Sequence, residues 1–162
     1  MRAHQTQSRQ ELADLDASRR ANALKDSIHV RSGKAGAAYG IIVFLTGFAL
    51  GTLRILVIAP LLGAATALVL EVSMILVVSW FVSRWCATGF RIPREMRPRL
   101  TMAAVAFAVV VAADWGTAVF AFQEKTTQFL ESYVTIAGLI GLCAQIAFAC
   151  FPVFQARESE IG

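Results

Sequence analysis

The stretch from Ala35 to Ser83 constrains the fold more than any other part of the chain. Only Arg54 and Glu71 are charged within it. A helix needs roughly 20 apolar residues to cross about 30 Å of hydrocarbon, and this stretch is more than twice as long. Two membrane-spanning helices must therefore fit between its ends.

The turn between these two helices is predicted near the middle of the stretch. Pro60 and Gly63 are the residues there that favour a turn, in the sequence Ala-Pro-Leu-Leu-Gly. We therefore expect spans over about 37–59 and 62–83, joined by a tight hairpin.

Two further spans follow in the second half of the chain. The region of about 101–122 is apolar with Asp114 as its charged residue, and about 132–153 lies in an uncharged run. Between the second and third spans, residues 84–99 contain five arginines and two prolines, which predicts a loop. Residues 157–162 form a short polar tail.

The predicted fold class is all-α, an integral membrane four-helix bundle with antiparallel, up-down-up-down helices. The 57% hydrophobic content exceeds the usual range of soluble domains and agrees with this class. We expect one membrane domain over 35–156, preceded by a polar segment, 1–34, that is either a short helix or disordered.

The positions of Lys and Arg predict the orientation in the membrane. Seven precede position 35, five lie in the 84–99 loop and Arg157 follows the last span, whereas Lys125 stands on the opposite side. Because cytoplasmic flanks carry the excess of these residues, we expect both termini in the cytoplasm of a bacterial inner membrane. The loop arginines are expected to contact anionic lipid headgroups: Arg84, Arg91, Arg94, Arg97 and Arg99.

Three ionisable residues lie inside the predicted spans, all in the half away from the 84–99 loop. They are Arg54, Glu71 and Asp114. Each costs about 2.5–3.5 kcal/mol on insertion scales, so each needs a partner or a function. These residues are the candidate site.

Two hypotheses account for the cluster. In the first, Arg54 pairs with Glu71 and has Asp114 as a second acceptor, which fixes helix register. In the second, one cation against two carboxylates leaves Asp114 protonated or occupied by an incoming cation. The second hypothesis predicts a proton or cation site.

Small residues predict the packed faces of two helices. Gly40, Gly47 and Gly51 share the face of Arg54, and the last two have the GxxxG spacing that lets another helix approach closely. On the fourth helix, three residues line up at helical spacing and are expected to pack or bond across helices: Gly138, Gly141 and Gln145.

Several kinds of site are excluded by the residues present. The histidines, His4 and His29, stand in the polar segment, and the three cysteines form no CxxC pair, so we expect no metal and no cofactor. The spans hold no serine–histidine pair for a hydrolase triad. The basic residues flank apolar runs, which argues against nucleic-acid binding.

The stretch 51–63, followed by 70–76 and Ser79-Trp80, resembles small uncharacterised bacterial multi-pass inner-membrane proteins. The resemblance covers the first hairpin and implies no activity. We therefore weigh three functions in this order: a structural or accessory membrane protein, a small proton- or cation-coupled transporter acting as an oligomer, and a lipid-modifying enzyme. The expected partners are the lipid bilayer and a second copy or a membrane complex.

Overall fold

The computed structural model describes residues 2–121, 127, 131 and 134–158, and within these residues the chain forms helices and no strand. Each of the four long helices contains a stretch that is long and apolar enough to cross a membrane. The all-α class and the four apolar helices are therefore confirmed. The long helices are α1 (Arg2–Leu53), α3 (Ala64–Gly89), α4 (Met96–Gly116) and α6 (Ile136–Glu158).

The first hairpin turns where Pro60 and Gly63 predicted it. Helix α1 passes into one turn of π-helix, η1 (Arg54–Ile58), and then into the short helix α2 (Ala59–Leu62). Pro60 has no backbone N–H, and next to it the Ala59 N–H bonds to the carbonyl of Arg54, the π-helical pattern. Gly63 then reverses the chain with φ 84°, a conformation that favours glycine.

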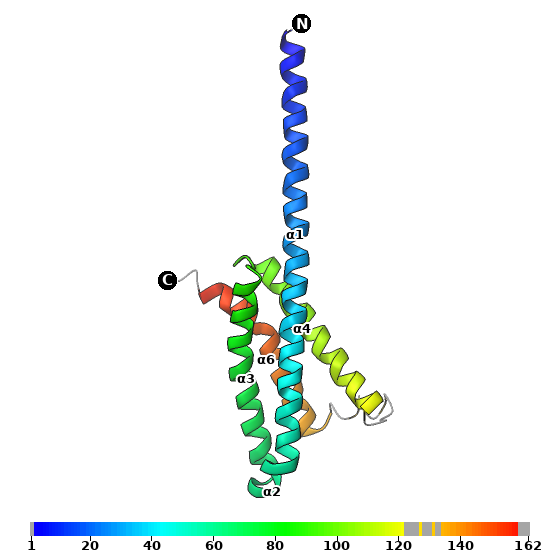
Figure 1. Ribbon diagram of the computed structural model, residues 1–162, viewed down its shortest axis with the longest axis vertical. Coiled ribbons are helices and arrows are strands. Elements are labelled where there is room, and N and C mark those ends of the chain that lie inside the picture. Colours follow the sequence, from blue (N-terminus) through cyan, green and yellow to red (C-terminus); the bar gives the residue numbers. More distant parts are fainter. Residues whose placement is uncertain (1, 122–126, 128–130, 132–133, 159–162) are drawn as a thin grey trace.

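Helix α1 is continuous from the polar segment into the first span. The segment 1–34 is thus helical from Arg2 onward, and no break separates it from the membrane domain predicted to begin at Ala35. The segment contains no proline, so every residue in it has the backbone N–H that a continuous helix needs. Residues 15–30 are almost entirely exposed, and Figure 1 shows this part of α1 projecting well beyond the other helices.

The predicted loop over 84–99 is shorter in the structure. Helix α3 continues to Gly89 and α4 begins at Met96, so the linker is residues 90–95. Arg84 near the end of α3 does not break the helix, because a span can continue as helix after it leaves the apolar layer. Pro98 lies in the first turn of α4, where its missing N–H needs no partner. The span ends predicted at 122 and 132 lie outside the described residues.

Long helices that follow one another along the chain run in opposite directions, so α1 and α4 run the same way, as do α3 and α6 (Figure 1). Helix α1 packs against α3 and α4, and α6 packs against the same two helices, so α3 and α4 occupy opposite corners of the bundle. The N-terminal extension of α1, the linker 90–95 and the end of α6 all lie at one end of the bundle. We call this the linker end.

The core is concentrated at the linker end. A Cβ on Gly36 would lie 2.5 Å from the Met102 carbonyl oxygen, and one on Gly40 would lie 2.8 Å from that of Ala106. These two glycines therefore allow the backbones of α1 and α4 to touch. The larger buried side chains around this contact are Tyr39, Val43, Cys86, Ile92, Met102, Val110 and Phe148.

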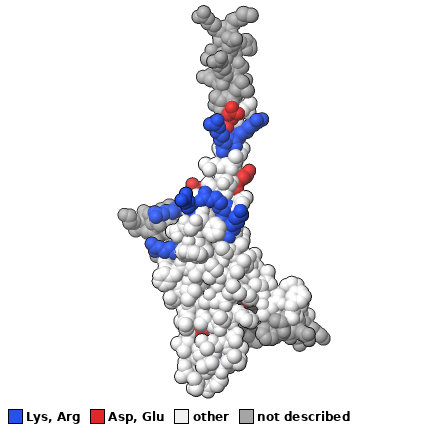
Figure 2. Space-filling view, viewed as in Figure 1, with Lys and Arg blue, Asp and Glu red and all other residues white. Residues whose placement is uncertain are grey.

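The outer surface of the bundle is apolar, with charge at one end. Leu56 is 71% exposed and Ile136 is 81% exposed, and similar side chains cover the outside of all four helices. Figure 2 shows Lys and Arg gathered at the linker end, while the rest of the visible bundle surface is almost free of charge. Exposed apolar patches of this extent are typical of surfaces that meet lipid.

Candidate functional site

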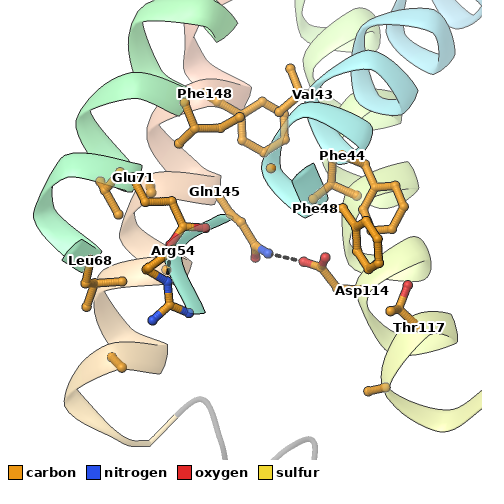
Figure 3. A pocket seen from close by; sticks show the side chains of 18 residues that line it. Val43, Phe44, Phe48, Arg54, Leu68, Glu71, Asp114, Thr117, Gln145 and Phe148 are labelled. Atoms are coloured by element: carbon orange, nitrogen blue, oxygen red, sulfur yellow. Dashed lines mark hydrogen bonds and ion pairs between the residues drawn. The ribbon is translucent and has the colours of Figure 1, made fainter. Parts of the chain in front are cut away.

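A cavity of about 440 Å³ lies between the four helices, in the half of the bundle away from the linker end (Figure 3). Its walls are mostly apolar, and the aromatic side chains Phe44, Phe48 and Phe148 contribute to them. Its volume falls in the range of small-molecule sites, about 300–1,000 Å³. The polar residues that line it are Arg54, Glu71, Asp114, Thr117 and Gln145.

Arg54 and Glu71 form an ion pair on one side of the cavity. Arg54 Nε lies 2.5 Å from Glu71 Oε2, joining η1 to α3, and the two side chains are 28% and 17% exposed. The contact brings opposite charges together within the apolar part of the bundle. Gly51 leaves room for this carboxylate, since a Cβ there would lie 3.1 Å from Glu71 Oε1.

Asp114 has a different partner on the other side of the cavity. Gln145 Nε2 of α6 donates a hydrogen bond to Asp114 Oδ2 of α4. Among the described residues Arg54 is paired with Glu71 and not with Asp114. Asp114, which was expected to be a second acceptor for Arg54, has Gln145 as its partner instead. In the view of Figure 3, Arg54 and Glu71 lie on one side and Asp114 on the other, with Gln145 between them.

The amide of Gln145 is only half satisfied. Its nitrogen faces the Asp114 carboxylate, as it must if that carboxylate accepts the bond. Its oxygen, Oε1, is buried and has no hydrogen-bond donor among the described residues. A buried acceptor of this kind costs about 1–3 kcal/mol when it stays unpaired.

Both short π-helical segments border the cavity. Arg54 is the first residue of η1, and Thr117 is the first residue of η2 (Thr117–Ala121), which follows α4. Thr117 Oγ1 donates to the carbonyl of Ala113 at 2.8 Å. Single π-helical turns inside α-helices occur frequently at functional sites, because they change the direction of side chains along one helix.

The glycines predicted to pack on α1 have different neighbours. Gly40 faces α4, whereas Gly47 and Gly51 face α3, where a Cβ on Gly47 would meet Ile75 at an ordinary 3.7 Å. The closest approach therefore belongs to Gly36 and Gly40. Their spacing is also GxxxG, so the signal was present in the sequence, at the edge of the polar segment.

Of the two glycines predicted to pack on the fourth helix, Gly141 has no packed neighbour. A Cβ on Gly141 would meet no atom within 4 Å, because this residue lines the cavity. Gly138 lies in the first turn of α6, where its N–H donates to Thr135 Oγ1 at 3.0 Å. Gly141 therefore leaves cavity space open, and Gly138 takes part in a helix cap.

The arginines predicted to contact lipid headgroups divide into two groups. Arg99 is buried, and its Nε donates to the carbonyl of Pro93 at 3.3 Å, so it holds the linker and is withdrawn from the surface. A second arginine with this function, Arg31, donates from Nη2 to the Phe90 carbonyl at 2.6 Å. The exposed ones are Arg84, Arg91, Arg94 and Arg97.

The cavity thus collects the three ionisable residues of the spans and the one glutamine predicted to bond across helices. It holds one guanidinium, two carboxyl groups and an unpaired amide oxygen within mostly apolar walls. Comparison of the chain with protein-family models, with curated proteins and with solved structures finds no match, so the function has to be inferred from this cavity.

Proposed function

We propose that the chain is a multi-pass protein of the bacterial inner membrane, with both termini and the linker 90–95 on the cytoplasmic side. Four apolar helices with exposed apolar surfaces support the membrane location. The gathering of Lys and Arg at the linker end supports the orientation, because cytoplasmic flanks carry the excess of these residues. The exposed arginines of this end contact anionic headgroups.

We further propose that the protein is a small proton- or cation-coupled transporter with Asp114 as the coupling group. The observation that carries the proposal is that Asp114 lies in a cavity and is bonded to a neutral amide, while Arg54 is taken by Glu71. Among the residues that the structure describes, no cation is paired with its carboxylate. It therefore binds either a proton or a cation, and exchange between the two couples their movements.

A purely structural cluster is the competing hypothesis. It requires the charges to neutralise one another in a dry bundle, as in the pairing of Arg54 with both carboxylates. The cavity and the Asp114–Gln145 bond favour the transporter instead. Both hypotheses share the Arg54–Glu71 pair, which therefore does not distinguish them.

The test is coupled flux in proteoliposomes. The full chain is reconstituted with an acidic lumen, and the pH gradient is followed with a fluorescent dye as Na⁺, K⁺ and organic ammonium ions are added in turn outside. Wild type is expected to dissipate the gradient with at least one of these cations, and Asp114→Asn is expected to lose the response. Glu95→Gln, which removes an exposed carboxylate from the linker, is the matched control. Equal responses of wild type and Asp114→Asn would contradict the proposal.

A further inference from the structure

The charged side chains that line the cavity indicate which net charge an occupant of the cavity would have. Arg54 contributes one positive charge, and Glu71 and Asp114 contribute two negative charges when both are ionised. The described lining residues from all four helices include no other ionisable side chain. In a low-dielectric site the single excess negative charge is compensated best by an occupant with one positive charge.

The unpaired amide oxygen of Gln145 adds a second requirement. The same side chain donates to Asp114 through its nitrogen. Two hydrogen-bond acceptors, the Gln145 Oε1 atom and the Asp114 carboxylate, therefore lie next to each other. Two acceptors on one side of a cavity are satisfied together by a group with at least two N–H donors. A primary or secondary ammonium has them, whereas Na⁺ and quaternary ammonium ions have none.

The walls of the cavity indicate the rest of the occupant. Phe44 and Phe48 project from α1 and Phe148 from α6, and most other lining side chains are aliphatic or small. Figure 3 shows the two α1 rings close to Asp114 and Phe148 on the far side of Gln145. Aromatic rings attract a cation over their faces, and apolar walls favour an apolar body behind it.

We infer that this cavity binds an amphipathic ammonium ion with a single positive charge and at least two N–H groups, the ammonium lying beside the bonded Asp114–Gln145 pair and its apolar part against the phenylalanines. The inference rests on the proposed cation-coupled function and names its substrate class. The carboxylate of a zwitterionic amino acid would bring back a negative charge beside Glu71, so the charge balance favours an amine without an acid group.

The experiment is calorimetric titration of the full chain in lipid nanodiscs with a matched set of small probes, with empty nanodiscs as the blank. The probes are phenethylammonium, its N,N,N-trimethyl derivative, 2-phenylethanol, phenylalanine and NaCl. Wild type is compared with Asp114→Asn, with Gln145→Met and with the exposed-site control Glu95→Gln. Thermal unfolding of each variant checks that it is folded before its binding is read.

Phenethylammonium is expected to bind wild type most tightly of the set. Asp114→Asn is expected to weaken it roughly 10- to 100-fold, since a hydrogen bond to a charged group contributes about 1.5–3 kcal/mol. Gln145→Met is expected to weaken it roughly 5-fold and to leave the trimethyl derivative unchanged, because that ion cannot donate to Oε1.

The other outcomes separate the two proposals. If the trimethyl derivative, Na⁺ or phenylalanine binds more tightly than phenethylammonium, and Asp114→Asn removes that binding, the substrate class is wrong and the coupling function stands. If wild type binds phenethylammonium no more tightly than its trimethyl derivative, the proposed substrate class is also wrong. If no probe binds in an Asp114-dependent way and no cation dissipates the gradient in proteoliposomes, both proposals are wrong.

Discussion

The hydroxyl of Tyr39 on α1 donates a hydrogen bond of 2.8 Å to the carbonyl oxygen of Phe148 on α6. In an unbroken helix that carbonyl would accept from the residue four positions later, which here is Pro152. Pro152 has no N–H, so the tyrosine supplies the donor that the helix lacks. The two rings also meet edge to face, with centroids 5.6 Å apart.

The Tyr39 bond is expected to matter because of Pro152. Tyr39→Phe should lower the free energy of unfolding by about 1–2 kcal/mol, since it removes a buried hydrogen bond and leaves a carbonyl unpaired. The same substitution should cost much less in a Pro152→Ala background, where residue 152 can donate to Phe148 itself. Denaturant unfolding in mixed micelles measures this double-mutant cycle, and equal costs in the two backgrounds would contradict it.

The contact between α1 and α4 predicts opposite effects of two glycine substitutions. Gly33→Ala should be neutral or stabilising by up to about 1 kcal/mol, because alanine favours helix and its Cβ would meet no atom within 4 Å. Gly36→Ala should destabilise, because its Cβ would lie 2.5 Å from a backbone oxygen of α4. Melting temperatures of the two variants test this, and a stabilised Gly36→Ala variant would show that the helices do not touch there.

The Arg54–Glu71 pair is expected to show energetic coupling. Glu71→Leu leaves a guanidinium without its partner, whereas the double substitution Arg54→Leu and Glu71→Leu removes both charges. The coupling energy from the two single variants and the double variant should be about 1–3 kcal/mol in favour of the pair. Additive effects on the unfolding free energy would argue against the ion pair.

The orientation can be tested with one cysteine at a time. Cys86, Cys143 and Cys150 are first replaced by alanine, and cysteine is then introduced at Ser18 or Thr127, both exposed. A membrane-impermeant maleimide added to cells with a permeable outer membrane should label Thr127→Cys at once. It should label Ser18→Cys only after the inner membrane is opened, and the reverse pattern would invert the proposed topology.

The sequence predicted the parts of this fold that depend on composition along the chain. A long uncharged run has to be divided into spans, and a charged group inside a span has to find a partner. The four helices, the turn at Gly63 and the contact of Arg54 with Glu71 across one hairpin follow from such local constraints.

The parts that depend on which helices become neighbours could not be predicted in this way. Asp114 bonds to Gln145 because α4 packs against α6, and no local pattern specifies that contact. The length of the 84–99 loop was predicted wrongly because arginines end an apolar span without ending a helix. The close helix contact at Gly36 and Gly40 was not predicted, because this GxxxG pair begins next to the polar segment and not in the middle of the span.

The continuity of α1 has a mechanical consequence. One unbroken helix carries cavity-lining residues such as Phe44 near one end and about 45 Å of helix before Ser32 at the other, at a rise of 1.5 Å per residue. A tilt of α1 by about 10° around its contact with α4 at Gly36 and Gly40 would displace the tip of that helix by roughly 9 Å. The N-terminal extension would thus act as a lever, in which a small tilt of the membrane-spanning part gives a larger displacement at the tip.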